Sequence, residues 1–139
     1  MINTRNRKWC DILGKSSNLL KFKHFAWSGV EKEDFKPSIE GERNQNETTV
    51  QHIIENGFGT CFHLNYYECS FDGFTPLEKL QEVHAVIVAR GEGKIIVDDD
   101  IYIVKPMDIV IIPKGASHQF ISTDDEPFGF FCIINKVVS

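Results

Sequence analysis

The sequence predicts an all-β domain, a sandwich or a barrel, preceded by an irregular N-terminal extension. From Thr48 onward, apolar runs of strand length alternate with Gly, Pro and Asp turns, and a helical period does not emerge. Regularly spaced short strands with little helix are typical of antiparallel barrels and sandwiches. At 139 residues and 42% hydrophobic content, the chain is long enough for one domain with its own core.

The expected strands follow one another at short intervals. We expect them at residues 48–54, 60–69, 84–90, 94–97, 101–104, 109–112, 119–122 and 128–135. The segment Gly91-Glu-Gly93 supplies the backbone freedom of a tight reversal, and Asp98-Asp-Asp100 separates two β-branched runs as a hairpin turn. Since no internal repeat is present, the strands predict one domain and not a fused pair.

The first 47 residues differ in character from the rest. They are polar, and neither the strand period nor the helix period prevails. Their scattered aromatic side chains include Phe22, Phe25, Trp27 and Phe35. We therefore divide the chain into an extension, residues 1–47, and a domain, residues 48–139. The extension is expected to pack on the domain or on a homodimer partner, where its aromatics would cover a sheet edge.

Charge and composition exclude several function classes. A net charge of −5 argues against a nucleic-acid binder, which needs a surplus of Lys and Arg on one face. No apolar stretch reaches the length of a membrane span, and the N-terminus lacks the apolar core of a secretory signal. We expect a cytoplasmic protein. Its four cysteines form no Cys-x-x-Cys pair and are expected to be buried, reduced thiols.

Four side chains in two segments form a candidate metal site. Glu78, Glu82 and His84 share one face of an extended segment, because side chains alternate along a strand. His118 could reach the same point from a facing strand. Two imidazoles with one or two carboxylates suit iron, manganese, nickel or zinc and leave positions open for a small molecule. The alternative for each residue is a core histidine or a surface carboxylate.

The other histidines give weaker signals. His63 has the strand parity of Asn65 and Tyr67, so it could also line a cavity. His24 and His52 have no constellation of ligands around them, which favours structural or exposed roles.

The two segments resemble the paired motifs of the cupin family. The first reads Thr75-Pro-Leu-Glu78-Lys-Leu80-Gln-Glu82-Val-His84 and continues to Gly91-Glu-Gly93. The second reads Pro106-Met-Asp108-Ile-Val-Ile-Ile-Pro113-Lys-Gly115-Ala-Ser-His118-Gln-Phe120. The resemblance implies a double-stranded antiparallel β-barrel of the jelly-roll type over about residues 48–135. It also implies a homodimer, and a metal ion held by histidines and a carboxylate.

The family pattern is altered at the ligand positions. Counted back from Gly91, the usual histidine slots of the first motif fall on Glu78 and Leu80, and the usual glutamate slot falls on His84. The carboxylate and one imidazole have therefore exchanged slots, and Leu80 takes the place of a ligand. The second motif keeps His118.

Two function classes follow, and both stay open. The first is a metal-dependent enzyme acting on a small molecule, by dioxygenase chemistry or by lyase or isomerase chemistry. Dioxygenase chemistry is favoured, because two histidines and one carboxylate are the habitual ligands of non-haem iron. The second is a non-catalytic module that binds a small molecule beside a degenerate metal site. Leu80 favours the second class, whereas the retained carboxylate and imidazoles favour the first.

Overall fold

The computed structural model describes residues 17–35, 48–55 and 57–136 of the chain. In chain order the strands are β1 (Phe22–Lys23), β2 (Ala26–Trp27), β3 (Lys32–Asp34), β4 (Thr49–Ile54), β5 (Phe62–Cys69), β6 (Glu78–Lys79), β7 (His84–Arg90), β8 (Gly93–Val97), β9 (Asp100–Val104), β10 (Ile109–Ile112), β11 (Ser117–Ser122) and β12 (Phe128–Asn135). The described residues contain no helix, so none offers the long apolar helix that crossing a membrane requires. The predicted all-β class is confirmed.

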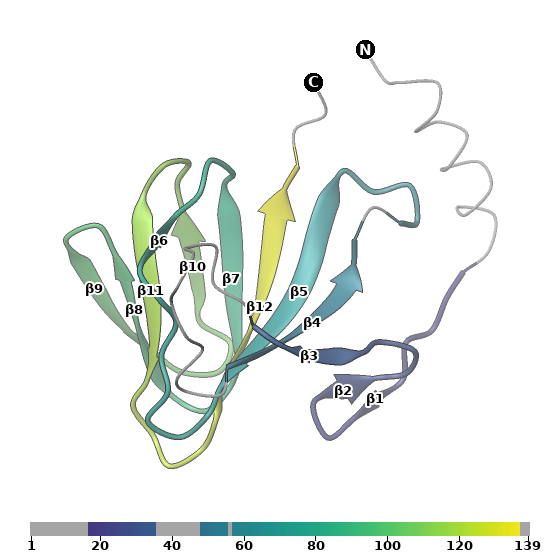
Figure 1. Ribbon diagram of the computed structural model, residues 1–139, viewed down its shortest axis with the longest axis horizontal. Coiled ribbons are helices and arrows are strands. Elements are labelled where there is room, and N and C mark those ends of the chain that lie inside the picture. Colours follow the sequence, from purple (N-terminus) through teal and green to yellow (C-terminus); the bar gives the residue numbers. More distant parts are fainter. Residues whose placement is uncertain (1–16, 36–47, 56, 137–139) are drawn as a thin grey trace.

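The strands form two larger sheets and a small N-terminal hairpin (Figure 1). The six-stranded sheet has the order β10-β7-β12-β5-β4-β3, and the four-stranded sheet has the order β6-β11-β8-β9. All pairings are antiparallel. Within the described residues, the hydrogen-bonded ladders do not join the two sheets into one closed barrel.

The core lies between the two sheets and follows the alternation of each strand. From His84 to Val88 in β7, and along all of β8, every second residue is buried, as the period of two requires. Phe120 of β11 and Phe130 of β12 stack with ring centroids 4.3 Å apart, which ties the four-stranded sheet to the six-stranded one. Of the cysteines, Cys69 and Cys132 are buried as expected, whereas Cys61 is exposed, and Cys10 lies outside the described residues.

The described part of the N-terminal extension is more regular than expected. Positive φ angles at His24 (51°) and Phe25 (54°) form the tight turn between β1 and β2. Trp27 packs edge-on against Tyr66 and Phe131, and β3 extends the six-stranded sheet beside β4. Residues 17–35 therefore pack on the outer face and edge of this chain's own six-stranded sheet.

The outer face of this sheet is closely fitted. Tyr66 is 1% exposed, and its hydroxyl donates to Glu68, which also accepts from Arg90. The Arg90 guanidinium lies 4.5 Å from the centre of the Phe25 ring. A side-chain carbon at Gly129 would collide with the Tyr66 hydroxyl, so only glycine fits there.

Candidate metal centre

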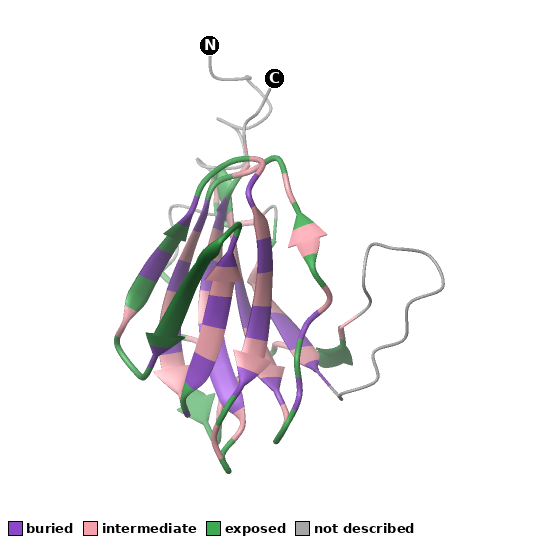
Figure 2. Ribbon diagram, turned by 90° about the vertical axis from the view of Figure 1, so that its left-hand side faces the viewer, coloured by how far each residue is buried: buried purple, intermediate pink, exposed green. Residues whose placement is uncertain are grey.

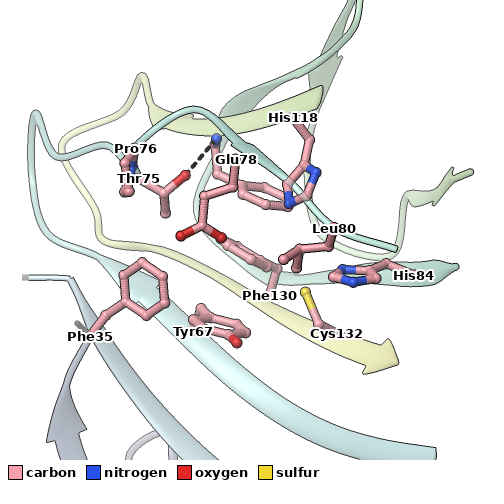
Figure 3. A pocket seen from close by; sticks show the side chains of 11 residues that line it. Phe35, Tyr67, Thr75, Pro76, Glu78, Leu80, His84, His118, Phe130 and Cys132 are labelled. Carbon is pink, nitrogen blue, oxygen red and sulfur yellow. Dashed lines mark hydrogen bonds between the residues drawn. The ribbon is translucent and has the colours of Figure 1, made fainter. Parts of the chain in front are cut away.

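A small cavity opens between the two sheets at the ends of β6, β7 and β11 (Figure 3). Its free space is about 40 Å³, enough to admit water or part of a small molecule. Its walls are mostly aromatic or aliphatic, with a few polar groups. The lining residues are Phe35, Tyr67, Thr75, Pro76, Glu78, Leu80, His84, His118, Phe120, Phe130 and Cys132. Three of the four predicted ligands, Glu78, His84 and His118, are therefore in one cavity.

His84 supplies a buried imidazole at the first residue of β7. It is 4% exposed, and its Nε2 atom is buried with no hydrogen-bond partner among the described residues. Burial, followed by the nearby charge of His118, lowers the pKa of His84 to about 4. The ring is therefore neutral at pH 7, which is the state that binds a metal ion.

His118 supplies the second imidazole from the facing sheet. It is also 4% exposed, and the two ring centroids lie 5.4 Å apart. The His118 Nδ1 atom lies 3.3 Å from the carbonyl oxygen of Ala116. Because a carbonyl only accepts, Nδ1 carries the hydrogen in this contact and Nε2 keeps its lone pair. A carbonyl that orients an imidazole in this way is a regular feature of metal sites.

Glu78 lies in the same cavity, but it does not close a three-ligand set. The β6–β11 register places Glu78 directly opposite His118. In Figure 3 the Glu78 carboxylate points toward Phe35 and Tyr67, and Leu80 lies between the two imidazoles in this view. Within the described residues, no three His, Cys, Asp or Glu side chains are grouped closely enough to hold a metal ion.

Glu82 is not brought to the cavity. The chain bends at residues 81–82, between β6 and β7, so the alternation of one strand does not carry across this segment. The Glu82 carboxylate instead accepts a hydrogen bond of 2.9 Å from the Lys136 ammonium group. This hydrogen bond lowers the pKa of Glu82.

The remaining histidines lie outside the cavity. His63 pairs with Ile134 and lies on the inner face of its sheet, as its position in the strand predicted. It does not line the cavity. Partial burial, followed by the charge of Lys136, lowers its pKa. His52 has partners that the sequence did not suggest: its Nδ1 atom lies 3.0 Å from the Asn65 amide oxygen and its Nε2 atom 3.7 Å from Glu33.

Several lining residues were not predicted from the sequence. Tyr67 lies between the rings of Phe35 and Phe130, and burial raises the pKa of its hydroxyl. Burial also raises the pKa of the Cys132 thiol, so it is a neutral group beside the imidazoles. The Thr75 hydroxyl accepts from the Phe120 amide, which leaves its own hydrogen available to a ligand. Strand parity alone would have placed Cys132 on the inner face.

A second, wider hollow lies next to the cavity. It has about 450 Å³ of free space and is lined by Glu33, Asp34, Phe35, Val50, His52 and Tyr67. Phe35 and Tyr67 line both spaces, and their rings meet edge to face at 5.5 Å. This aromatic pair is therefore the partition between the inner cavity and the outer hollow.

Comparisons with known proteins agree with this architecture. The family model described as "Cupin domain" matches residues 80–134, which include both imidazoles. A Rhodospirillum rubrum protein named 1-methylthio-D-xylulose 5-phosphate methylsulfurylase is 33% identical over 111 residues, covering 80% of this chain and 69% of the relative.

Solved structures of cupin-2 proteins are also similar to this chain. A cupin-2 domain protein from Rhodospirillum rubrum superposes with a TM-score of 0.73 at 30% identity, over 88% of this chain and 80% of that one. A cupin 2 conserved barrel domain protein from Rhodopseudomonas palustris superposes with a TM-score of 0.70 at 28% identity, over 81% and 76% of the two chains. The altered motifs, the two facing sheets and these relatives lead to one conclusion: the chain belongs to the cupin family.

Proposed function

We propose that this cupin binds a divalent metal ion through His84 and His118 and acts on a small molecule held beside it. The observation that carries the proposal is that the Nε2 atom of His84 is buried and has no hydrogen-bond partner among the described residues. A buried ring nitrogen without a partner among the described residues costs free energy, and a metal ion would satisfy it. The second imidazole faces it across the cavity, with its Nδ1 hydrogen directed to a carbonyl.

Glu78 is the proposed third ligand. Its position opposite His118 lets a change of side-chain rotamer direct the carboxylate to the two imidazoles. Iron, manganese, nickel and zinc all accept this donor set. When bound, the ion would supply Lewis acidity, or dioxygen chemistry if it is iron.

The chain's own residues define what the ion could meet. Phe120, Phe130 and Leu80 give the cavity apolar walls, and polar interactions are stronger beside such walls than in bulk water. The Thr75 hydroxyl can donate to an oxygen of the bound molecule. We therefore propose a substrate that presents two adjacent oxygens, such as a 2-keto acid or a vicinal diol.

The substrate of the Rhodospirillum rubrum relative provides a useful contrast. Its name specifies a ketose phosphate, and a phosphate group usually meets Lys, Arg or backbone amides. Among the described residues that line the inner cavity and the outer hollow, none is a lysine or an arginine, and the outer hollow carries Glu33 and Asp34. We propose that this chain prefers a substrate without a phosphate group.

Leu80 supports a second candidate function, a binding module without catalysis. It lines the cavity at a position where the family usually provides an imidazole, which removes one ligand. In this alternative the aromatic walls hold a small molecule, and the imidazoles bind it through hydrogen bonds.

Oxygen uptake tests the oxygenase form of the first candidate. Apo-protein would be reconstituted anaerobically with Fe(II), mixed with 2-keto acids or vicinal diols, and exposed to oxygen. The oxygenase interpretation predicts uptake that depends on Glu78 and persists in the Glu82→Gln control. Uptake no greater than that of Glu78→Ala would rule out the oxygenase, and would favour the binding module or Lewis-acid chemistry that uses no oxygen.

A further inference from the structure

The outer hollow is large enough for most of a small molecule, whereas the inner cavity is not. The hollow offers about 450 Å³ of free space and the cavity about 40 Å³. Several hundred Å³ is the usual size of a small-molecule site. Phe35 and Tyr67 line both spaces, so one molecule could have its reacting end in the cavity and its remainder in the hollow.

One carboxylate faces the hollow from the edge strand β3. Glu33 pairs with Val50, and directly opposite residues of paired strands share one face of the sheet. Asp34 pairs with Thr49 on the alternate face, although it also borders the hollow. All three residues of β3 are exposed, as the burial colouring of Figure 2 shows. The charge that the register directs to the hollow is therefore that of Glu33.

A chain of polar contacts links Glu33 to the aromatic partition. The Asn65 side-chain amide donates to the Tyr67 hydroxyl at 3.3 Å, which turns its oxygen to the Nδ1 atom of His52, 3.0 Å away. This Nδ1 atom carries the hydrogen, because an amide oxygen only accepts. The Nε2 atom of the same ring lies 3.7 Å from the Glu33 carboxylate. The wall of the hollow is therefore ordered before a ligand arrives, which lowers the entropic cost of binding.

The Phe35 and Tyr67 rings supply surfaces that attract a cation. Their planes are 85° apart, so the edge of one ring meets a face of the other. Phe130 stacks on Tyr67 and covers one more face. Phe35 and Tyr67 are both half-buried, so each keeps ring surface for a ligand. The face of an aromatic ring carries partial negative charge and attracts an alkylated ammonium group.

We propose that the substrate of this cupin is an organic cation. Its alkylated ammonium group would lie in the outer hollow, against Phe35 and Tyr67, with the Glu33 carboxylate as the counter-charge. Its two oxygens would lie in the inner cavity, where the buried Nε2 atom of His84 has no partner among the described residues. The placement of the oxygens rests on the proposed function, whereas the preference for a cation rests on the hollow.

Charge distinguishes a cation from the other possible ligands. An anion would meet the Glu33 carboxylate, and among the described residues that line the two spaces none is a lysine or an arginine. In Figure 3 the Glu78 carboxylate also points toward Phe35 and Tyr67. The net charge of −5 adds long-range attraction for a cation. A neutral molecule of the same shape would fit the hollow without these attractions, which makes it the control ligand.

A matched pair of probes tests the preference for charge. The first is a vicinal diol that carries a trimethylammonium group, and the second has a tert-butyl group in its place and is neutral. Each would be titrated into the whole chain in EDTA and followed by NMR, which detects millimolar affinities. We expect the cation to bind about tenfold more tightly than its neutral isostere. Equal affinities, tighter binding of the isostere, or binding of neither probe would overturn the proposal.

Two variants assign the contacts. Glu33→Gln keeps the size of the side chain and removes its charge, so it should weaken binding of the cation about threefold. Phe35→Leu keeps an apolar wall without a ring and should have a similar effect. Binding of the isostere should not change in either variant, which shows that the hollow remains folded. Glu92→Gln, an equal change of charge at an exposed turn outside the hollow, is the control. Unchanged affinity for the cation in Glu33→Gln or in Phe35→Leu would overturn the proposed site.

Metal loading separates this proposal from the proposed function. In protein loaded with Mn(II), calorimetry should show that both diols bind more tightly than in EDTA, and replacement of His84 and His118 by alanine should abolish that increase. No increase, with the preference for the cation retained, would contradict the metal site and support a cation site in a binding module. An increase without any preference for the cation would contradict the cation site and leave the metal site supported.

Discussion

Acidification should destabilise the metal-free protein through one buried histidine. The unfolded chain binds a proton at His84 near the ordinary pKa of about 6.5, whereas burial holds the folded pKa at about 4. Since the unfolded state is protonated first, stability is complete above pH 6.5, falls as the pH is lowered, and levels off below pH 4. The pKa difference corresponds to a loss of at most about 3 kcal/mol, and about 2 kcal/mol between pH 7 and pH 4.5.

Urea unfolding of the protein in EDTA measures this loss. The free energy of unfolding would be compared at pH 7 and pH 4.5 for the wild type and for His84→Leu. The substitution changes packing at both pH values, but it removes the titrating group, so the difference between the two pH dependences isolates His84. We expect the wild type to lose about 2 kcal/mol more than the variant. Equal losses would refute the assignment of a buried, neutral imidazole.

Three further predictions concern packing and access. Gly129→Ala should lower the free energy of unfolding in urea by about 1–3 kcal/mol, because the new methyl group meets the Tyr66 hydroxyl. Gly57→Ala is the control and should have little effect, since its methyl group has space. Equal effects of the two substitutions would contradict the close approach of Gly129 and Tyr66. Phe35→Ala should join the cavity to the outer hollow, and thiol labelling of Cys132 should then become faster. Cys69 is the internal control, since its labelling rate should not change. Unchanged labelling of Cys132 would show that Phe35 does not separate the two spaces. Trp27→Ala should lower the free energy of unfolding by about 2 kcal/mol and expose β1 and β2 to proteolysis, because the ring packs on Tyr66 and Phe131. A cleavage pattern like that of the wild type would contradict this packing.

Most of the fold could be predicted from local patterns. Eight expected strands correspond to β4, β5 and β7–β12, because each is long enough to show alternation and is bounded by turn residues. The boundaries shift by up to two residues, as at β11, which begins at Ser117. Strands β1, β2, β3 and β6 were not predicted, because two or three residues carry no periodic signal. They are strands only because a neighbouring strand provides hydrogen bonds.

The position of a site residue could be predicted where that residue lies in a long strand, because the alternation of side chains then gives its direction. His84 and His118 each begin or lie in a long strand, so their inward direction follows from alternation. Glu82 was expected on the same face, but the bend at residues 81–82 ends the alternation before it. Tyr67 and Phe35 were not predicted as walls of one cavity, because the contact between β5 and the end of the N-terminal segment depends on tertiary packing.

Metal content tests the central claim most directly. Protein purified without an affinity tag would be loaded with Mn(II) or Co(II), dialysed, and analysed for bound metal by mass spectrometry. We predict about one ion per chain in the wild type and in Glu82→Gln, weaker retention in Glu78→Ala, and loss of the ion when His84 and His118 are both replaced by alanine. Metal content that is unchanged in the double variant would contradict the account, because the ion would then be bound elsewhere.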